Sequence, residues 1–298
     1  MINLYDELAA YAEVECDKSF KEMTTLRIGG KVRYTIYPKD VLALCEIMRV
    51  LDREHVPFKL LGKGSDLLCS DKPYDGAVIR LDRFFNDFHI FGTRMVAEAG
   101  CSIIALSVEA MKKGLSGLEF ASGIPGTLGG TLFMNAGAYR SSMSDVVQEV
   151  CVYHDKKVFW MNNAECEFAY RTSFFQKHPD YIILAASFAL DEKNSEDIDA
   201  LMADRRRRRM ASQPLDKPSC GSVFRNPDER NAWSFIDGIG YRGKSIGGAM
   251  VSDKHCNFIV NTGGATANDY AALVEEIKEK VFEKYGVRLE TEMEKFNW

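Results

Sequence analysis

The chain has 298 residues, of which 46% are hydrophobic and 27% charged, and its formal charge is −5. This length accommodates about two domains with a substantial buried core, and the acidic balance excludes a general attraction to nucleic acid. No apolar run approaches the ~18 residues of a membrane helix, and the acidic first residues do not resemble a signal peptide. We therefore expect a cytoplasmic protein without a membrane segment.

The first half of the sequence predicts alternating helices and strands. An amphipathic pattern predicts a helix from Asn3 to Val14, and apolar positions at helical spacing predict further helices over 40–54 and 103–114. Short apolar or alternating runs predict strands at 32–37, 58–61, 77–81, 95–99, 147–153, 157–161 and 181–190. Because the order lacks a regular βαβ rhythm, these elements favour an α+β fold.

Prolines mark the candidate domain boundary in the second half. The pattern over 196–209 predicts a helix that ends near Pro214 and Pro218, which places the boundary at about 200–218. Farther on, Thr266 and Asp269 have capping-box spacing and predict a helix that ends at Gly286.

The eight cysteines are scattered without a C-x-x-C pair, which favours buried free thiols over structural zinc, so no metal site is expected.

Two glycine-rich segments predict ligand-binding loops. Leu61-Gly-Lys-Gly-Ser-Asp-Leu-Leu68 leaves a predicted strand through glycines that expose successive backbone N–H groups, an arrangement that binds phosphate oxygens. It is neither a P-loop nor a G-x-G-x-x-G fingerprint, so an ordinary tight turn is its leading alternative. Ser122-Gly-Ile-Pro-Gly-Thr-Leu-Gly-Gly130 is too glycine-rich for a helix interior and predicts backbone packed closely against a bulky ligand.

Ser222, in Pro218-Ser-Cys-Gly-Ser-Val-Phe-Arg-Asn-Pro227, is the clearest candidate for a catalytic side chain. Its setting differs from the G-x-S-x-G elbow of serine hydrolases, because Gly221 precedes it directly and bulky Val223 and Phe224 follow. We interpret Ser222 as a proton donor, with a glycine-serine turn before a strand as the structural alternative. A hydroxyl is a weak acid, so this role requires a strongly basic carbon beside it in a water-poor pocket.

In this order, the motifs resemble those of the UDP-N-acetylenolpyruvoylglucosamine reductase family of bacterial cell-wall synthesis, over nearly the whole chain. The resemblance is carried by Gly62-Lys-Gly-Ser65, Gly114–Gly126, Met134-Asn-Ala-Gly-Ala138, Tyr170–Ser173, Gln213–Leu215, Cys220–Phe224, Ile246–Ala249 and Lys254–Asn261. No extra segment separates Tyr170–Ser173 from the following strand, so the chain resembles the shorter type II form of the family.

The resemblance implies a noncovalently bound FAD in a fold of the vanillyl-alcohol-oxidase (PCMH) type. An FAD-binding domain would occupy 1–200, in subdomains of about 1–72 and 73–200, and a smaller α+β substrate-binding domain would occupy 201–298. The last strand, about 288–298, is expected to pack back on the FAD domain. The implied FAD-binding residues are Gly62, Gly64, Ser65, Asp66, Leu67, Gly123, Ile124, Pro125, Gly126, Gly129, Gly130, Asn135, Ala136 and Gly137.

The resemblance also implies the reaction. NADPH would reduce the flavin, which passes hydride from N5 to C3 of the enolpyruvyl group of UDP-N-acetylglucosamine enolpyruvate, and protonation of C2 would give UDP-N-acetylmuramate. Arg171 would bind the substrate carboxylate as a bidentate fork, Glu292 would lie near that carboxylate, and Ser222 would protonate C2. Residues 290, 292 and 294 share one face of a strand, so only the resemblance favours Glu292 over Glu290 and Glu294.

Asn226, Lys254 and Arg209 are assigned to substrate binding. Arg209 ends the run Arg205–Arg209, whose side chains fan out by ~100° each on a helix, so most of this run is expected to be solvated. Three positions depart from the family: Asp66 stands where relatives usually have Asn, Lys63 where they have a third Gly, and Ser212 where many have Lys. The contact of Asp66 with FAD and a diphosphate contact at Ser212 are therefore in doubt. We expect a monomer whose partners are small molecules, without nucleic acid or membrane.

Three alternatives accompany this interpretation. The chain is a different flavin oxidoreductase of the same fold, such as an oxidase, or a catalytically silent FAD-binding module, or an RNA-binding protein built on the arginine run. The joint presence of Arg171, Ser222 and Glu292 argues against the oxidase, and the retained proton donor Ser222 argues against a silent module. The acidic net charge and the lack of aromatic RNA-binding motifs disfavour the third.

Overall fold

Two compact units divide the chain. The computed structural model describes residues 3–227 and 230–298. Unit 1 comprises the segment up to Cys16 with Tyr34–Lys63 and Asp75–Arg207, and unit 2 comprises Asp17–Arg33, Gly64–Tyr74 and Arg208–Trp298. The predicted division at residue 200 is a single cut, whereas unit 2 also takes in two early segments. The assignment of an FAD domain and a substrate domain to parts of the chain therefore stays a prediction.

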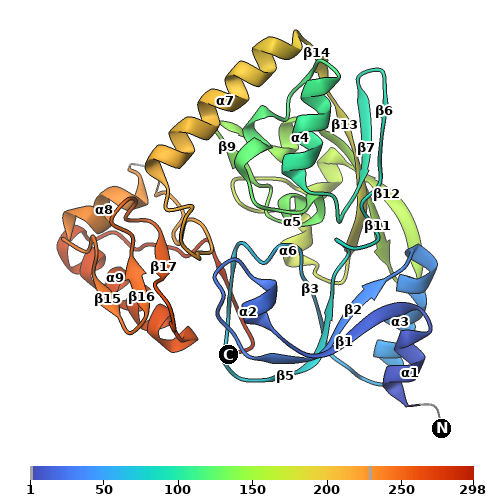
Figure 1. Cartoon of the computed structure of the whole chain (residues 1–298), viewed down its shortest axis with the longest axis horizontal. Helices are drawn as coiled ribbons and strands as arrows, with labels where there is room; N and C mark the ends of the chain where they lie inside the picture. Colours follow the sequence, from blue (N-terminus) through green and yellow to red (C-terminus); the bar gives the residue numbers. More distant parts are fainter. Residues whose placement is uncertain (1–2, 228–229) are drawn as a thin grey trace. The chain divides into compact units, whose positions relative to one another are not determined.

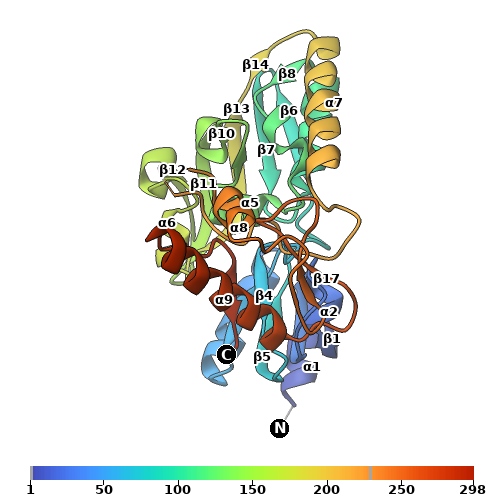
Figure 2. The same ribbon diagram turned by 90° about the vertical axis from the view of Figure 1, so that its left-hand side faces the viewer.

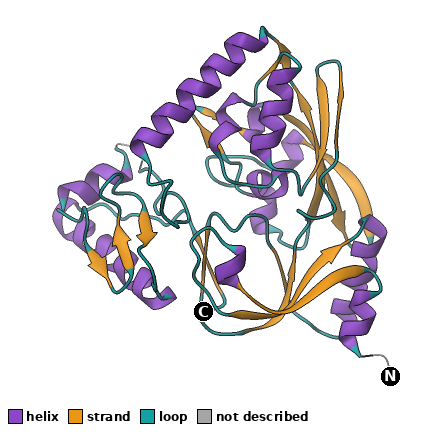
Figure 3. Cartoon of the chain, in the orientation of Figure 1, coloured by secondary structure: helices purple, strands orange, loops and turns teal. Residues whose placement is uncertain are grey.

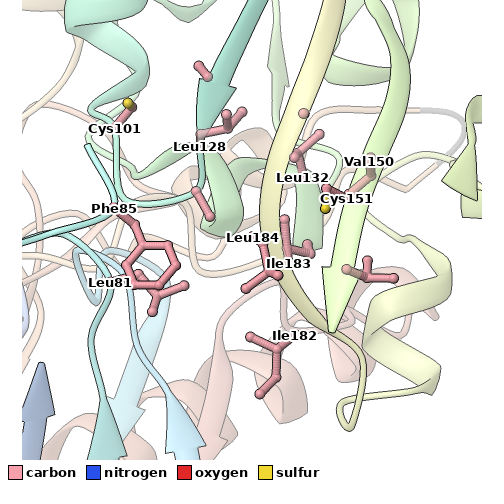
Figure 4. Packing of buried hydrophobic residues seen from close by; sticks show 14 of the residues in the cluster. Leu81, Phe85, Cys101, Leu128, Leu132, Val150, Cys151, Ile182, Ile183 and Leu184 are labelled. Carbon is pink, nitrogen blue, oxygen red and sulfur yellow. The ribbon is translucent and has the colours of Figure 1, made fainter. Parts of the chain in front are cut away.

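Unit 1 is built around an antiparallel sheet in the order β12-β11-β13-β7-β6 (Figure 1). Its strands are β6 (Phe88–Phe91), β7 (Arg94–Glu98), β11 (Val147–His154), β12 (Lys157–Asn162) and β13 (Ile182–Ala189). Helix α5 (Leu128–Phe133) packs on β13 and β7. Leu128 and Leu132 of this helix lie among the buried side chains of β11 and β13 (Figure 4). Burial of this apolar surface is the main source of stability for the unit.

A second sheet has the strand order β1-β2-β5-β3. Its strands are β1 (Ala12–Ser19), β2 (Lys31–Pro38), β3 (Phe58–Leu60) and β5 (Tyr74–Ile79), and β3 runs parallel to β5. Helix α3 (Val41–Arg53) connects β2 to β3 and contacts α1 (Leu4–Ala9). The Asp40 carboxylate begins α3 by accepting a hydrogen bond from the Ala43 N–H at 2.8 Å.

Unit 2 has its own core beneath a long helix. Strands β15 (Ser245–Ile246), β16 (Ala249–Val251) and β17 (Ile259–Asn261) form an antiparallel sheet. Helix α9 (Ala267–Tyr285) packs on β15 and β16 and contacts α8 (Ala232–Gly238); both helices are visible in Figure 2. The predicted capping box of Thr266 and Asp269 begins α9, and Gly286 ends it in a left-handed conformation with φ 67°.

The remaining elements are short, except for one long helix. The C-terminal strand β18 (Glu294–Phe296) pairs in parallel with β4 (Leu67–Cys69), and both strands belong to unit 2. The others are α2 (Phe20–Met23), α4 (Ile103–Lys112), β8 (Leu115–Ser116), η1 (Glu119–Gly123), β9 (Gly137–Ala138), β10 (Ser141–Ser142), η2 (Met143–Asp145), η3 (Asn163–Cys166), α6 (Phe174–Lys177), β14 (Asp191–Glu192) and α7 (Ser195–Ser212). Helices and strands thus occur together in both units, which confirms the α+β class (Figure 3).

Two predicted elements are wrong. The helix expected over 3–14 ends at Ala9, and Ala12 already belongs to β1, because pairing in a sheet outweighs the local amphipathic pattern. The strand expected over about 288–298 is regular only from Glu294 to Phe296.

All eight cysteines are free thiols, and six of them are buried. Within residues 3–227 and 230–298, no helix combines the length and apolar character needed to cross a membrane.

Candidate active site

The second glycine-rich segment folds as a turn that enters a helix. Thr127 caps α5, where its hydroxyl accepts a hydrogen bond from the Gly130 N–H at 3.3 Å. Gly129 and Gly130 therefore lie inside a helix, and the prediction that this segment is too glycine-rich for one is wrong. The reason is close packing: a Cβ on Gly129 would lie 3.2 Å from the Ala99 Cβ, so a larger residue would push α5 away from that strand end.

The first and second glycine loops meet inside unit 1. A Cβ on Gly62 would lie 2.4 Å from Thr127 Oγ1, closer than real side chains allow. The backbone of the first loop therefore rests against the helix cap of the second. A glycine loop whose successive backbone N–H groups can bind phosphate oxygens, packed against the Thr127 side chain that begins α5, suits the phosphate groups of a dinucleotide, so the residues present fit FAD. Ile124, Pro125 and Gly126 form the turn that leads to Thr127.

The segment after α5 is held by the amide of Asn135. This residue is 4% exposed and has a left-handed φ of 41°. Its Nδ2 donates to the Ala169 carbonyl at 2.8 Å, and its Oδ1 accepts from the Ser144 N–H at 3.0 Å. The Ala136 N–H donates to the Thr131 carbonyl at 2.8 Å. The Asn135 side chain therefore fixes the loop that continues into Ala136 and Gly137.

Arg171 lies against this same loop. Its Nη2 donates to the Gly137 carbonyl at 2.7 Å, and its guanidinium carbon lies 5.2 Å from the centroid of the Tyr170 ring. The Arg171 backbone is left-handed, with φ 54°. The structure thus brings together Arg171 and the predicted FAD-binding segment at Gly137. The sequence contains no signal for this contact, because the two residues are 34 positions apart.

Unit 2 holds the rest of the first glycine loop. The Gly64 carbonyl accepts from the Thr25 N–H at 3.2 Å, and the Asp66 carbonyl accepts from the Glu294 N–H at 3.1 Å. Leu67 begins β4, which pairs with β18. Asp66 is therefore tied through its backbone to the C-terminal strand and Gly64 to Thr25, while Ser65 and Asp66 are half-buried.

Ser222 lies in a segment fixed by main-chain hydrogen bonds. The Val223 N–H donates to the Asn257 carbonyl at 2.8 Å, and the Phe224 N–H donates to Asn257 Oδ1 at 3.0 Å. Asn257 Nδ2 in turn donates to the Phe224 carbonyl at 2.8 Å. Ser222 itself is half-buried. Sequence reasoning missed Asn257 as the residue that positions Ser222, although it belongs to the Lys254–Asn261 motif.

Glu292 is the one of the three candidate glutamates that is sheltered from solvent. Its N–H donates to the Val223 carbonyl at 2.8 Å, which brings its backbone beside that of Ser222. Glu292 is half-buried, whereas Glu290 and Glu294 are exposed. Partial burial is the setting in which a carboxyl group interacts strongly with neighbouring charges, so the structure favours Glu292 over its two neighbours.

The segment that contains Ser222 also contains a buried thiol, Cys220, which contacts the buried phenol of Tyr270. Cys220 Sγ and the Tyr270 hydroxyl are 3.0 Å apart. Burial, together with the negative charge of Asp66, raises the pKa of Cys220 to about 12 and raises the pKa of Tyr270 well above its usual value. Both groups are therefore neutral at physiological pH. Cys220, two residues before Ser222, and Tyr270 are both fully buried.

The three residues assigned to substrate occupy different positions in unit 2. Asn226 is exposed, and its Oδ1 accepts from the Ala232 N–H at 3.0 Å at the start of α8. Lys254 donates from Nζ to the Met210 carbonyl. It lines a cavity of about 340 Å³ with Met210, Pro214, Leu215, Asp216, Lys217, Ser252 and Asp253. Arg209 is half-buried in α7, next to Met210.

Comparisons with known proteins agree with this geometry. Residues 32–156 match the family model of an FAD binding domain, and residues 213–296 match that of the UDP-N-acetylenolpyruvoylglucosamine reductase C-terminal domain. UDP-N-acetylenolpyruvoylglucosamine reductase of Anoxybacillus flavithermus is 40% identical over 297 residues, covering 99% of this chain and 98% of the relative. The reductase of Thermotoga sp. strain RQ2 is 43% identical over 272 residues, covering 91% of this chain and 89% of the relative.

Solved structures extend the comparison to the fold. The crystal structure of UDP-N-acetylenolpyruvylglucosamine reductase (MurB) from Thermus caldophilus superposes with a TM-score of 0.81 at 34% identity, covering 96% of this chain and 99% of that one. BBE-like 1 of Physcomitrella patens, with a TM-score of 0.50 at 15% identity over 64% of this chain and 45% of its own, shares the fold alone. The chain belongs to the UDP-N-acetylenolpyruvoylglucosamine reductase family.

Proposed function

We propose that this protein reduces the enolpyruvyl group of UDP-N-acetylglucosamine enolpyruvate to UDP-N-acetylmuramate, with FAD as its cofactor and NADPH as its reductant. The observation that carries this proposal is the presence of both the FAD binding domain and the reductase C-terminal domain in one chain, with 40% identity to a named reductase over 99% of its length. A general flavin oxidase is disfavoured, because it would not require the reductase C-terminal domain.

FAD would be held by the two glycine loops. Backbone N–H groups of the first loop, from Gly62 to Ser65, would bind its phosphates, because the first N–H groups of α5 already donate to carbonyl and hydroxyl oxygens of the protein. Ala136 and Gly137 would line the cofactor farther along. Bound FAD supplies the transfer of hydride from NADPH to the enolpyruvyl carbon. The close approach at Gly62 supports this placement, because a side chain there would collide with Thr127 and disturb the packing of the two loops.

Three side chains would serve the substrate. Arg171 would bind the carboxylate, because a guanidinium matches a carboxylate with two parallel hydrogen bonds and stabilises the negative charge that develops during reduction. Ser222 would donate the proton to C2. Glu292, whose N–H bonds to the Val223 carbonyl next to Ser222, would lie near the substrate carboxylate and interact with its negative charge. Hydrogen bonding of Arg171 to Gly137 and the clamp of Asn257 on Phe224 support these roles, since both fix the groups in advance.

The remaining parts of the proposal follow from this reaction. Lys254, Asn226 and Arg209 would bind the nucleotide part of the substrate, and the cavity beside Lys254 supports a ligand contact there. Nucleotide sugars and NADPH are metabolites of the cytoplasm, so the enzyme would act there, as a monomer without nucleic-acid or membrane partners. As a step of peptidoglycan synthesis, the activity would serve cell-wall biogenesis and hence cell shape, cell division and the cell cycle.

One experiment tests the proposal directly. The purified protein should be yellow, and it should oxidise NADPH at 340 nm only when UDP-N-acetylglucosamine enolpyruvate is added. A yellow protein that consumes NADPH with oxygen alone would instead be an oxidase. A colourless protein that fails to bind added FAD would contradict the cofactor assignment.

A further inference from the structure

A tight hairpin next to Arg171 has an unusual backbone. Strands β9 and β10 pair through Gly137 with Ser142 and Ala138 with Ser141, which leaves Tyr139 and Arg140 as the two turn residues. Both are left-handed, with φ 56° and 64°. Two-residue hairpin turns of this kind favour Asn and Gly, because a side chain at positive φ is sterically strained. The fold must therefore hold this turn in place by contacts elsewhere.

Helix α7 supplies those contacts. The Tyr139 hydroxyl donates to the Arg205 carbonyl at 2.9 Å, and the Arg205 guanidinium carbon lies 4.8 Å from the centroid of the Tyr139 ring. The Glu119 carboxylate, which is 7% exposed, accepts hydrogen bonds from Ser116 Oγ at 2.6 Å and from the Gly117 N–H at 2.8 Å. The positive charge of Arg205 also acts to lower the pKa of this carboxylate. Arg205 thus contacts an aromatic ring and interacts electrostatically with a buried carboxylate.

The hairpin in turn holds Arg171. Gly137, the first residue of the hairpin, accepts the 2.7 Å hydrogen bond from Arg171 Nη2. A Cβ on Gly137 would lie 2.4 Å from the Ser141 carbonyl oxygen, so the two strands of the hairpin are packed without space for a side chain. A movement of Tyr139 would therefore shift the Gly137 carbonyl, and with it the end of the Arg171 side chain.

We propose that Tyr139 and Arg205 are positioning residues for Arg171: they fix the β9–β10 hairpin, whose Gly137 carbonyl orients the guanidinium that binds the substrate carboxylate. This inference rests on the proposed function. It separates Arg205, the first arginine of the run Arg205–Arg209, from the rest, because Arg205 contacts Tyr139 of the hairpin and not the substrate diphosphate. The neighbouring Arg206 is exposed and offers a matched control in the same helix.

The test separates the two half-reactions of the holoenzyme. Tyr139→Phe removes the hydroxyl and keeps the ring, Arg205→Met removes the charge and keeps the length, and Arg206→Met is the control. Reduction of bound FAD by NADPH is measured first, and then reoxidation of the reduced enzyme by UDP-N-acetylglucosamine enolpyruvate. We expect reoxidation to slow about tenfold or more in the first two variants, because small displacements of a positioning group have effects of up to about 10²-fold. NADPH reduction and FAD content should match the wild type, and Arg205→Lys should restore much of the loss.

Several results would overturn the inference. Reoxidation within twofold of wild type in both variants would remove the role, as would an equal loss in Arg206→Met. A parallel loss of FAD content or of NADPH reduction would show a general folding contribution instead. The wild-type enzyme distinguishes this failure from that of the proposed function: if its reduced FAD is not reoxidised by the enolpyruvate, the reductase assignment itself fails, and the positioning role falls with it.

Discussion

Arg171 and Ser222 are held in place by opposite means. In unit 1, Arg171 is fixed at the end of its side chain, by the Gly137 carbonyl, in surroundings where several residues have left-handed backbones. In unit 2, Ser222 is fixed through the main chain on its C-terminal side, where Asn257 binds Val223 and Phe224 and Glu292 pairs with Val223. A long flexible side chain must be oriented at its tip, whereas a short hydroxyl is oriented by its backbone alone.

This difference predicts different responses to mutation. Around Arg171, contacts are shared among side chains on separate elements, so single substitutions should give graded losses. Around Ser222, the contacts are backbone bonds in a buried region, so substitutions should either remove the reacting group cleanly or destabilise the whole segment.

The largest expected effect is that of Ser222→Ala. Loss of a positioned proton donor should slow reoxidation of the reduced enzyme by the enolpyruvate about 10²- to 10⁴-fold, because general acid catalysis typically contributes that much. Reduction of FAD by NADPH should be unchanged, as measured by stopped-flow absorbance of the flavin. Ser219→Ala, in the same segment, serves as the control. If Ser222→Ala also loses NADPH reduction, the serine has a structural role and the proton-donor assignment is wrong.

Asn257→Ala should have the next largest effect. It removes the buried amide that bonds to both the N–H and the carbonyl of Phe224, and leaves these groups without those partners. We expect the free energy of unfolding to fall by about 2–4 kcal/mol, as for the loss of two buried hydrogen bonds. Urea denaturation measures this change. A decrease of less than about 0.5 kcal/mol in the free energy of unfolding would show that the Ser222 segment does not depend on the Asn257 hydrogen bonds. The proposed difference between the two units would then lose its support in unit 2.

Gly62→Ala tests the cofactor side of unit 1. The new methyl group would lie 2.4 Å from Thr127 Oγ1, so the two glycine loops must separate. FAD affinity should fall about tenfold or more, a loss of about 1.4 kcal/mol in binding. Titration of the apoprotein with FAD, followed by flavin fluorescence, measures it. Gly130→Ala, also at an implied FAD-binding position, is the milder comparison, because its Cβ would lie 3.3 Å from Thr127 Oγ1, and it should lose less affinity for FAD. Equal losses in both variants would show a general effect on α5.

Whether the sequence predicts an element of the fold depends on how far apart in the chain the interacting residues lie. Helices α3, α4 and α9 have strong periodicity and clear ends, and the sequence predicts them closely. The parallel pairing of β4 with β18 joins segments more than 200 residues apart, which no local pattern encodes. It also explains why unit 2 includes an early segment of the chain.

The candidate site shows the same limit. Ser222 and the glycine loops are visible in the sequence because unusual residue types gather there. The choice of Glu292 among three glutamates required the family resemblance, and burial in the structure now supports it independently. The contacts of Arg171 with Gly137, and of Asn257 with Phe224, depend on tertiary packing and left no trace in the local pattern.

The smallest expected effect is that of Glu119→Gln, which removes the carboxylate that interacts with the charge of Arg205. Burial acts to raise the pKa of Glu119, but hydrogen bonds from Ser116 and from backbone N–H groups, with the nearby charge of Arg205, lower it below its usual value. A carboxyl whose pKa is lower in the folded state stabilises the fold above its unfolded pKa, and this contribution disappears as the pH falls through the folded value. Glu119→Gln should therefore lower the melting temperature at pH 7 and have less effect near pH 4.

Thermal melts of wild type and variant at both pH values measure this difference, with Glu98→Gln as the control for removing one carboxylate from unit 1. An equal decrease at both pH values would mean that Glu119 acts through packing and not through its charge. In that case the graded response expected around Arg171 would depend on the two interactions of Arg205 with Tyr139, the ring contact and the hydrogen bond from the Tyr139 hydroxyl. A smaller decrease at low pH would place the charge of Glu119 among the forces that hold Arg205, and through it the hairpin.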